Sequence, residues 1–166
     1  MNESRVGLGI DFHRFAPDRK LVLGGVTLPH DRGLLGHSDA DVLTHAICDA
    51  LLGAAGLGDI GVHFPDTDER YRGASSLDLL AQVMDLLASS GSTPVNVDVT
   101  VLAEAPKLAP HFAEMRSMLA DVLGIEGDRI GLKATTCEGM GAVGRREGMG
   151  AMAVALVKRG TPDPCT

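Results

Sequence analysis

Hydrophobic residues alternate with polar or small residues in two stretches of the chain, Val6–Ile10 and Val95–Val101. A repeat of two is typical of a strand with one buried face, so both stretches are predicted to be strands. Ile130–Ala134 and the mostly apolar Met149–Val157 are predicted to be strands as well. Leu21–Leu28 carries apolar residues on both sides of a Gly-Gly pair, which indicates a strand interrupted by a turn or bulge.

Three other stretches have the spacing of a helix with one apolar face. The first is predicted to begin at Ser38, because Ser38–Asp41 resembles a capping box and an apolar stripe follows through Leu51. The second follows the cap Ser75–Asp78, and the third is Pro110–Leu123, with a glycine directly after it. Strands and helices alternate with short connections. The pattern predicts an α+β two-layer sandwich, with a mixed, roughly four-stranded sheet packed on helices.

The length of 166 residues fits a single domain, which we expect to span residues 1–160. Two prolines in the last six residues indicate a flexible C-terminal tail at 161–166. Aromatic residues make up only 3% of the chain, so its core must be aliphatic.

The formal net charge of −7 argues against a basic surface that binds nucleic acid. The sequence has no apolar run of about 18 residues, so no membrane span is expected. The three cysteines are widely spaced and form no Cys-x-x-Cys pair, which favours a reducing compartment over a disulfide framework. A cytoplasmic location is the expectation that follows.

Asp11 and His13 are the first candidates for metal chemistry. Residues two apart in a strand point to the same side, so both side chains can reach one ion. His45, on the first predicted helix, is a candidate third ligand. Two histidines and one carboxylate, with a fourth position open, are a common catalytic zinc set. The alternative is an ordinary surface ion pair at the end of a strand.

Asp41 and Asp49 lie four residues before and after His45, which places all three on one helical face. A carboxylate beside a metal-binding histidine can orient the ring and raise its basicity, and we assign this role to both residues. The alternative is that Asp41 only caps the helix and that Asp49 is solvated.

His37 and Ser38 precede the same helix, whose N-terminus offers free N–H groups to a phosphate. The acidic, turn-rich segments Leu57–Gly61 and Phe64–Asp68 carry groups that can bind the hydroxyls of a polyol. Plain capping and solvated turns are the alternatives.

Further polar groups follow two of the predicted strands. The loop Ala103–Leu108 is stiffened by proline and includes Lys107, which can meet a phosphate. Lys133–Glu138 offers hydroxyls for a diphosphate and a carboxylate for a hard divalent cation. The guanidinium of Arg145 also matches phosphate geometry. The sequence contains no P-loop and no Gly-x-Ser-x-Gly motif.

These motifs, taken together and in order, resemble those of the 2-C-methyl-D-erythritol 2,4-cyclodiphosphate synthase family over nearly the whole chain. The segments that carry the resemblance are Arg5–His13, Leu23–Val26, Gly33–Val42, Asp49–Ala55, Leu57–Gly61, Phe64–Asp68, Asn96–Asp98, Ala105–Lys107, Lys133–Thr136 and Glu147–Gly148.

The resemblance implies a role for each candidate. It implies zinc ligands at Asp11, His13 and His45, and a second divalent ion, Mg²⁺ or Mn²⁺, at Glu138. It assigns catalytic roles to these four residues and Thr136. The implied contacts to phosphate and erythritol are His37, Ser38, Asp59, Ile60, Gly61 and Asp66, and those to cytidine and diphosphate are Ala103, Lys107, Leu108, Ala134, Thr135 and Thr136, to which we add Arg145.

The implied activity is that of a phosphorus–oxygen lyase of the non-mevalonate isoprenoid pathway. The substrate would be 4-diphosphocytidyl-2-C-methyl-D-erythritol 2-phosphate, whose 2-phosphate attacks the β-phosphorus to close a cyclic diphosphate and release CMP. The implied assembly is a homotrimer with active sites between subunits. Two other classes stay open: a metal-dependent nucleotide phosphohydrolase, and a metal- or nucleotide-binding protein without catalysis.

Overall fold

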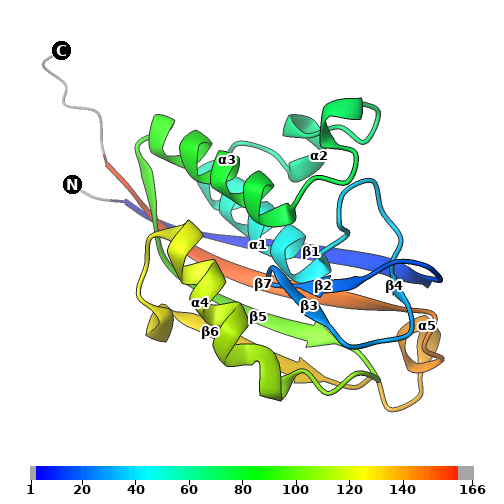
Figure 1. The fold of residues 1–166 in the computed structure, drawn as a ribbon. Coiled ribbons are helices and arrows are strands. Elements are labelled where there is room, and N and C mark those ends of the chain that lie inside the picture. Colours follow the sequence, from blue (N-terminus) through cyan, green and yellow to red (C-terminus); the bar gives the residue numbers. More distant parts are fainter. Residues whose placement is uncertain (1–2, 161–166) are drawn as a thin grey trace, which may run out of the picture.

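The computed structural model describes residues 3–160, so the predicted tail at 161–166 lies outside the described residues. One mixed sheet of five strands, in the order β4-β1-β7-β5-β6, forms the base of the fold (Figure 1). Its strands are β1 (Glu3–Ala16), β4 (Gly33–Leu34), β5 (Ser92–Leu102), β6 (Ile130–Thr135) and β7 (Gly148–Arg159). The α+β class and the mixed sheet are as predicted. The fifth strand is the two-residue β4, which is too short for a periodic pattern to reveal.

Strand directions decide which ends of the sheet can carry a site. β1 pairs antiparallel with β7, β7 pairs antiparallel with β5, and β5 pairs parallel with β6. β1, β5 and β6 therefore run in the same direction, and their C-terminal ends lie at one edge of the sheet. β7 separates β1 from β5, which places these two strands about 10 Å apart.

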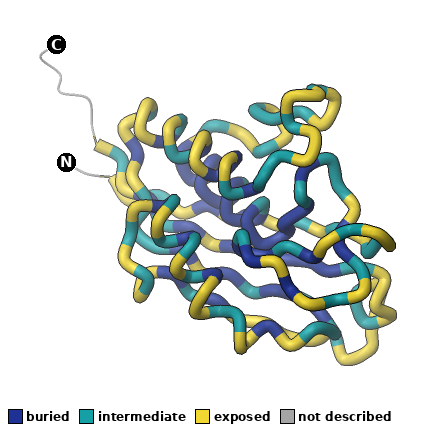
Figure 2. The backbone as a smooth tube through the Cα atoms, viewed as in Figure 1, coloured by how far each residue is buried: buried dark blue, intermediate teal, exposed yellow. Residues whose placement is uncertain are grey.

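Three helices cover one face of the sheet: α1 (Val42–Ala55), α3 (Ser76–Ser89) and α4 (Phe112–Leu123). Figure 2 shows that α1 is the most deeply buried of them, at the centre of the helical layer. A separate hairpin, β2 (Leu21–Leu23) and β3 (Val26–Leu28), confirms the turn predicted at the Gly-Gly pair. The short elements were not predicted: α2 (Ile60–His63), α5 (Gly141–Gly144) and the 3₁₀ turns Glu69–Tyr71, Ala109–His111 and Gly127–Arg129.

The first helix begins at Val42, and the prediction that it begins at Ser38 was wrong. Its N-cap is Asp41, whose side chain accepts the backbone N–H of Thr44. The Ser38 hydroxyl accepts the N–H of Ala40 instead, inside the loop before the helix. Because the helix begins at Val42, His37 and Ser38 lie in the loop before it. The buried Asp41 carboxylate already caps the helix N-terminus, which therefore offers little to a phosphate.

Close contact between α1 and β1 depends on two glycines. A Cβ on Gly7 would lie 2.0 Å from the carbonyl oxygen of Ala50, and a Cβ on Gly9 would lie 2.0 Å from that of Ala46. The helix backbone therefore rests directly on the strand. This contact places His45, next to Ala46 in the chain, over the end of β1.

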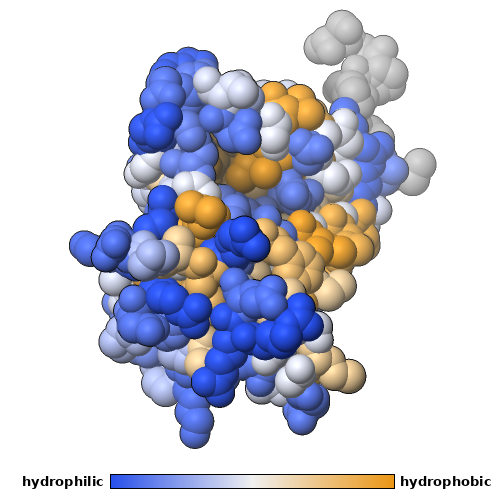
Figure 3. All heavy atoms as spheres, turned by 90° about the vertical axis from the view of Figure 1, so that its right-hand side faces the viewer, coloured by the Kyte–Doolittle hydropathy of each residue, from blue (hydrophilic) through white to orange (hydrophobic). Residues whose placement is uncertain are grey.

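The opposite face of the sheet carries no helix among the described residues. Val6, Leu8, Ile10 and Phe12 point from β1 to this face, and Val6 is 67% exposed. Figure 3 shows hydrophobic residues gathered along its right-hand side, where this face lies. Met152 and Val154 on β7 extend the apolar strip. No helix within residues 3–160 is long and apolar enough to cross a membrane.

Candidate metal centre

Asp11, His13 and His45 form one compact cluster of possible metal ligands. The Oδ2 atom of Asp11 lies 3.0 Å from Nε2 of His13 and 3.1 Å from Nδ1 of His45. The two ring nitrogens are 3.3 Å apart. The three possible ligand atoms therefore form a nearly equilateral triangle, and the structure brings together the three residues that the sequence predicted to share one ion.

The alternation of β1 explains how two of the ligands meet. Asp11 and His13 point toward the helices, while Ile10 and Phe12 point to the open sheet face. The other ring nitrogen of His13, Nδ1, lies 2.7 Å from the carbonyl oxygen of Leu35. A carbonyl only accepts, so Nδ1 carries the proton and Nε2 presents its lone pair to the cluster.

The charges of the cluster stabilise one another. Burial by itself would raise the pKa of Asp11, but hydrogen bonds and charge from His13 and His45 outweigh burial and hold that pKa well below its ordinary value. Burial also opposes the charged form of His13, yet the neighbouring Asp11 carboxylate raises its pKa above the ordinary value. The site thus favours positive charge beside Asp11, as a cation-binding site must.

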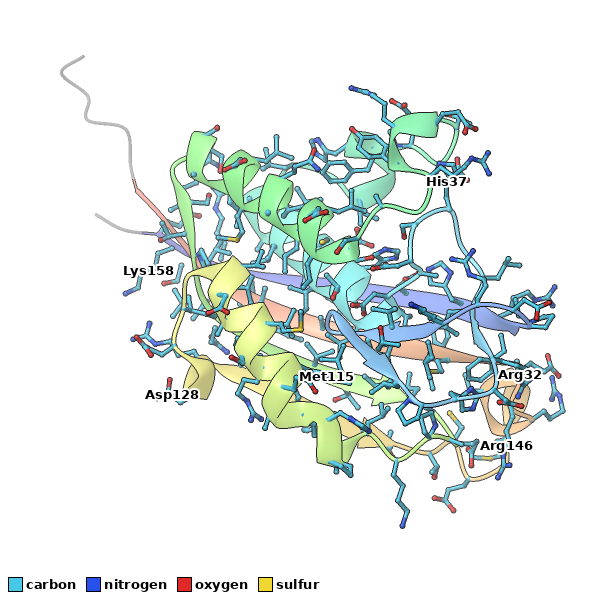
Figure 4. The ribbon with its side chains drawn as sticks, viewed as in Figure 1. Arg32, His37, Met115, Asp128, Arg146 and Lys158 are labelled. Carbon is cyan, nitrogen blue, oxygen red and sulfur yellow. The ribbon has the colours of Figure 1, made fainter. Side chains whose placement is uncertain are left out.

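The cluster lies in the wall of a cavity with a volume of about 490 Å³, which is in the range of small-molecule sites. Figure 4 labels His37, one of the residues that line this cavity, on the loop between β4 and α1. Hydrophobic residues line part of the hollow surface at this end of the molecule (Figure 3). The cavity is lined by Asp11, His13, Gly36, His37, Ser38, His45, Ile60, Gly61, Phe64, Pro65, Asp66, Tyr71 and Leu79.

The candidates for phosphate and erythritol contacts meet around this cavity. His37, Ser38, Ile60, Gly61 and Asp66 line it. The ring of His37 is held by a contact of 3.1 Å between Nε2 and the carbonyl oxygen of Asp68.

Asp59 stands beside the lining residues as the N-cap of α2, where its Oδ1 accepts the N–H of Val62. Sequence reasoning missed Tyr71 and Leu79, because neither belongs to a recognisable polar motif.

Asp41 and Asp49 make no hydrogen bond to the His45 ring among the described residues, so their role in orienting it stays a prediction. The Asp41 carboxylate is buried and accepts from Gly25 N, Thr44 N and the Thr44 hydroxyl. Asp49 accepts the N–H of Ile60 at 2.8 Å and so fixes the start of α2. Each of the two carboxylates accepts hydrogen bonds from backbone N–H groups: Asp41 from Gly25 and Thr44, and Asp49 from Ile60.

The candidates for cytidine and diphosphate contacts lie elsewhere, in the loops after β5 and β6. Glu104 joins the two loops, since its Oε1 accepts Cys137 N at 2.8 Å. Ala103 N also donates to the carbonyl oxygen of Thr135. Ala103 and Leu108 are buried, whereas Lys107 is exposed. Among the described residues, none from positions 103–138 lines the metal-site cavity.

The exposed end of β6 carries the candidate for a second metal. Thr136 donates its hydroxyl proton to Oε1 of Glu138 at 2.7 Å, and Ala134 and Thr135 are exposed beside them. Glu138 itself has a left-handed backbone, with φ of 52°. The guanidinium of Arg145, a candidate for a phosphate, pairs with Glu147, with Nε 2.7 Å from Oε1.

The fold and the cavity define a class: an α+β protein with a histidine-carboxylate site that fits a divalent metal ion. The chain belongs to the YgbB family, whose model matches residues 4–158. A relative from Symbiobacterium thermophilum, named 2-C-methyl-D-erythritol 2,4-cyclodiphosphate synthase, is 60% identical over 92% of this chain and 97% of its own.

Solved structures agree with this assignment. A 2C-methyl-D-erythritol-2,4-cyclodiphosphate synthase in a CDP-bound form is 40% identical, with a TM-score of 0.84 over 92% of this chain and 99% of that one. The bifunctional IspDF of Campylobacter jejuni is 42% identical, with a TM-score of 0.92. The match covers 96% of this chain but only 43% of that longer protein.

Proposed function

We propose that the chain is a 2-C-methyl-D-erythritol 2,4-cyclodiphosphate synthase. The observation that carries the proposal is the triangle of Asp11, His13 and His45 in a cavity of a YgbB-family chain. The reaction converts 4-diphosphocytidyl-2-C-methyl-D-erythritol 2-phosphate into the cyclic diphosphate and CMP. An oxygen of the 2-phosphate forms a bond to the β-phosphorus, while the bond from that phosphorus to the CMP oxygen breaks. The activity is formally that of a phosphorus–oxygen lyase.

Zinc is the metal we propose for the triangle. Tetrahedral zinc with bonds of about 2.0–2.2 Å needs ligand atoms roughly 3.3–3.6 Å apart. The three separations here are 3.0, 3.1 and 3.3 Å, so small side-chain movements would bring the three atoms to the zinc geometry. Bound there, zinc would polarise a phosphate oxygen and offset its charge. Two imidazoles and one carboxylate leave a fourth position for substrate or water.

The chain's own residues then have to position two phosphates that repel each other. Ser38 and His37 border the metal triangle, and the Ser38 hydroxyl is placed to donate to a phosphate oxygen, while the His37 ring donates Nε2–H to the Asp68 carbonyl. Ile60, Gly61 and Asp66, on the facing side of the cavity, suit the hydroxyls of the erythritol. The attacking phosphate is already an anion, so little proton transfer is needed. Positioning and charge compensation therefore account for most of the catalysis.

The loops after β5 and β6 form the proposed cytidine and diphosphate site. Rigid backbone groups of the 103–108 loop suit a base, and Lys107 suits a phosphate. Thr135 and Thr136 offer exposed hydroxyls. Glu138 is proposed to hold the second divalent cation, Mg²⁺ or Mn²⁺, against the diphosphate.

A homotrimer with shared sites is part of the proposal. The metal-site cavity has no lining residue from positions 103–138, so one chain does not bring both halves of the site together. The apolar strip of Val6, Leu8, Ile10, Phe12, Met152 and Val154 offers a surface for a second copy. A cyclic assembly sets one patch of a subunit against a different patch of its neighbour, which can join the two halves. We also propose a cytoplasmic location and one domain at 1–160.

Product analysis tests the proposed reaction directly. The purified protein is incubated with zinc, magnesium and the cytidine diphosphate substrate, and the products are identified by mass spectrometry. Cyclic diphosphate and CMP in equal amounts are expected. A hydrolysed phosphate would instead identify a phosphohydrolase, and no turnover in a metal-loaded trimer would indicate a binding protein.

A further inference from the structure

The side of the His45 ring that faces away from the metal triangle contacts two serines. Its Nε2 atom lies 2.9 Å from the hydroxyl of Ser76 and 3.2 Å from that of Ser38. Ser76 is fully buried at the first position of α3. Its hydroxyl in turn donates to Oδ1 of Asp39. A chain of hydrogen bonds therefore runs from the ring through Ser76 to a carboxylate.

We infer that Ser76 and Asp39 are positioning residues that hold the proton of His45 on Nε2 and so aim the lone pair of Nδ1 at the metal. The inference rests on the metal site proposed above. A serine hydroxyl has a single proton, and an ionised carboxylate can only accept. Because the single O–H of Ser76 donates its hydrogen bond to Asp39, the Ser76 oxygen can only accept from the ring. Nε2 of His45 must therefore carry an N–H that donates to it.

Ser38, the second serine beside Nε2, could favour the other tautomer of His45. If Ser38 donated to Nε2, the ring would carry its proton on Nδ1, where it would bond Asp11 and block the metal position. The Ser38 hydroxyl accepts the N–H of Ala40, which leaves its own proton free to turn either way. The hydrogen bonds from Nε2 to Ser76 and from Ser76 to Asp39 disfavour the Nδ1-protonated ring. The Ser38 hydroxyl proton is then available to a ligand in the cavity.

Asp39 is itself held rigidly in the loop before α1. Its backbone N–H donates to the carbonyl oxygen of Ala74 at 3.0 Å. Its Oδ2 accepts the N–H of Ser76, so Asp39 caps α3 from a different segment, while the N-cap residue Ser75 makes no capping bond of its own. The same carboxylate thus fixes both the start of α3 and the proton of His45.

His13 is held in the corresponding way by a different acceptor. Its Nδ1 contacts the Leu35 carbonyl, which leaves Nε2 free for the metal. Each histidine therefore has one nitrogen tied to an acceptor and the other directed at Asp11. Partners of this kind raise metal affinity because they fix the ring before the ion arrives.

Zinc affinity of Ser76→Ala, measured by competition with a chromophoric chelator, tests the inference. We expect zinc binding about 10- to 100-fold weaker than in the parent protein. Ser75→Ala is the matched control, since Ser75 makes no side-chain capping bond, and its affinity should equal that of the parent. Ser76→Thr keeps the hydroxyl and should recover affinity.

Unfolding temperatures separate positioning from support of α3. If Ser76→Ala melts earlier but binds zinc as tightly as Ser75→Ala, Ser76 is only structural and the inference fails. If Ser76→Ala does not fold, Asp39→Asn is the second variant, and zinc affinity equal to that of the parent overturns the inference there. His45→Ala is measured alongside. Full zinc binding in that variant would refute the metal site itself. Loss of zinc from His45→Ala, together with normal zinc binding by Ser76→Ala, would refute only the positioning role of Ser76 and Asp39.

Discussion

The carboxylate oxygen Oδ2 of Asp11 lies 3.1 Å from Nδ1 of His45, although 34 residues separate the two in the chain. The end of β1 and the buried helix α1 bring them together. Gly9 allows this approach because it has no Cβ, which would overlap the Ala46 carbonyl. The metal triangle is therefore a product of helix–strand packing, and changes to that packing should affect it.

Removing either histidine should remove the metal. His13→Ala and His45→Ala each leave two ligands, and we expect zinc content to fall to a small fraction of that in the parent protein after dialysis. Elemental analysis of the purified variants measures this directly. His111→Ala is the control, because His111 lies on the 3₁₀ turn before α4 and does not line the cavity. Full zinc occupancy in both His13→Ala and His45→Ala would show that the triangle is not the site.

Zinc binding should weaken as the pH falls. His13 must lose its proton to bind the ion, and its pKa is raised by Asp11 above the ordinary histidine value of about 6.5. Proton competition therefore begins at a higher pH than for an isolated histidine, and each proton displaced costs about tenfold in affinity per pH unit. Chelator competition between about pH 6 and pH 8 measures the slope.

The stability of the metal-free protein should have the opposite dependence. A folded-state pKa above the unfolded value means that His13 stabilises the fold below the unfolded pKa, and that this contribution is lost as the pH rises through the folded pKa. Zinc-loaded protein should not lose stability over that range. Thermal unfolding of the metal-free and zinc-loaded protein over this pH range measures both stabilities. In the chelator experiment, a zinc affinity that does not change with pH would mean that His13 binds no metal.

The packing of α1 on β1 can be tested with two glycine substitutions. Gly9→Ala forces a methyl group against the helix backbone and should destabilise the fold by about 1–3 kcal/mol or more. Gly53→Ala is the matched control in α1, where the added methyl meets nothing within 4 Å and should stabilise the helix by about 0.5–1 kcal/mol. Denaturant unfolding gives both free energies. Equal effects of the two substitutions would contradict this account of the contact.

The sequence predicted the ligands better than it predicted their supports. Asp11 and His13 were accessible to prediction because alternation in a strand fixes which residues share a side. The Ser38–Asp41 motif resembled a capping box, yet three of its side chains serve different partners: Ser38 contacts Ala40 N, Asp39 caps α3, and Asp41 caps α1. Local spacing cannot reveal the partner of Asp39, because Ser76 lies 37 residues away.

Short elements and long-range contacts were missed for the same reason. The sheet has four long strands, as expected, but β4 contributes only two residues and leaves no periodic signal. Asp49 lies on the predicted face of α1, but its bond to Ile60 N depends on where α2 begins. Pattern reasoning thus finds the elements and the faces of side chains, while partners across the fold depend on how the elements pack.

Glu138→Gln should impair catalysis without removing zinc. The amide keeps the size of the side chain but loses the charge that we propose holds the second cation, so more magnesium should be needed for the same rate. Activity against magnesium concentration, with zinc content measured in parallel, tests this. Glu114→Gln in the first turn of α4 is the control, and its titration should match that of the parent. A Glu138→Gln titration that also matches the parent would refute the role.

A mixture of two inactive variants should regain activity if sites are shared between subunits. His45→Ala destroys the metal half of a site, and Lys107→Ala, at an exposed position after β5, destroys the nucleotide half. In a closed ring, each proposed site takes its metal half from one chain and its nucleotide half from the next.

Equal amounts of the two variants are unfolded together and reassembled with zinc. At random mixing, the chance that the metal half comes from a Lys107→Ala chain is one half, and so is the chance that the nucleotide half comes from a His45→Ala chain. About a quarter of the sites should then be intact by counting neighbours around the ring. Each variant refolded alone, with its assembly checked by light scattering, is the control. If every site lay within one chain, each would keep one defect in any mixture. Properly assembled but inactive mixtures would therefore show that the two halves of the site come from the same subunit.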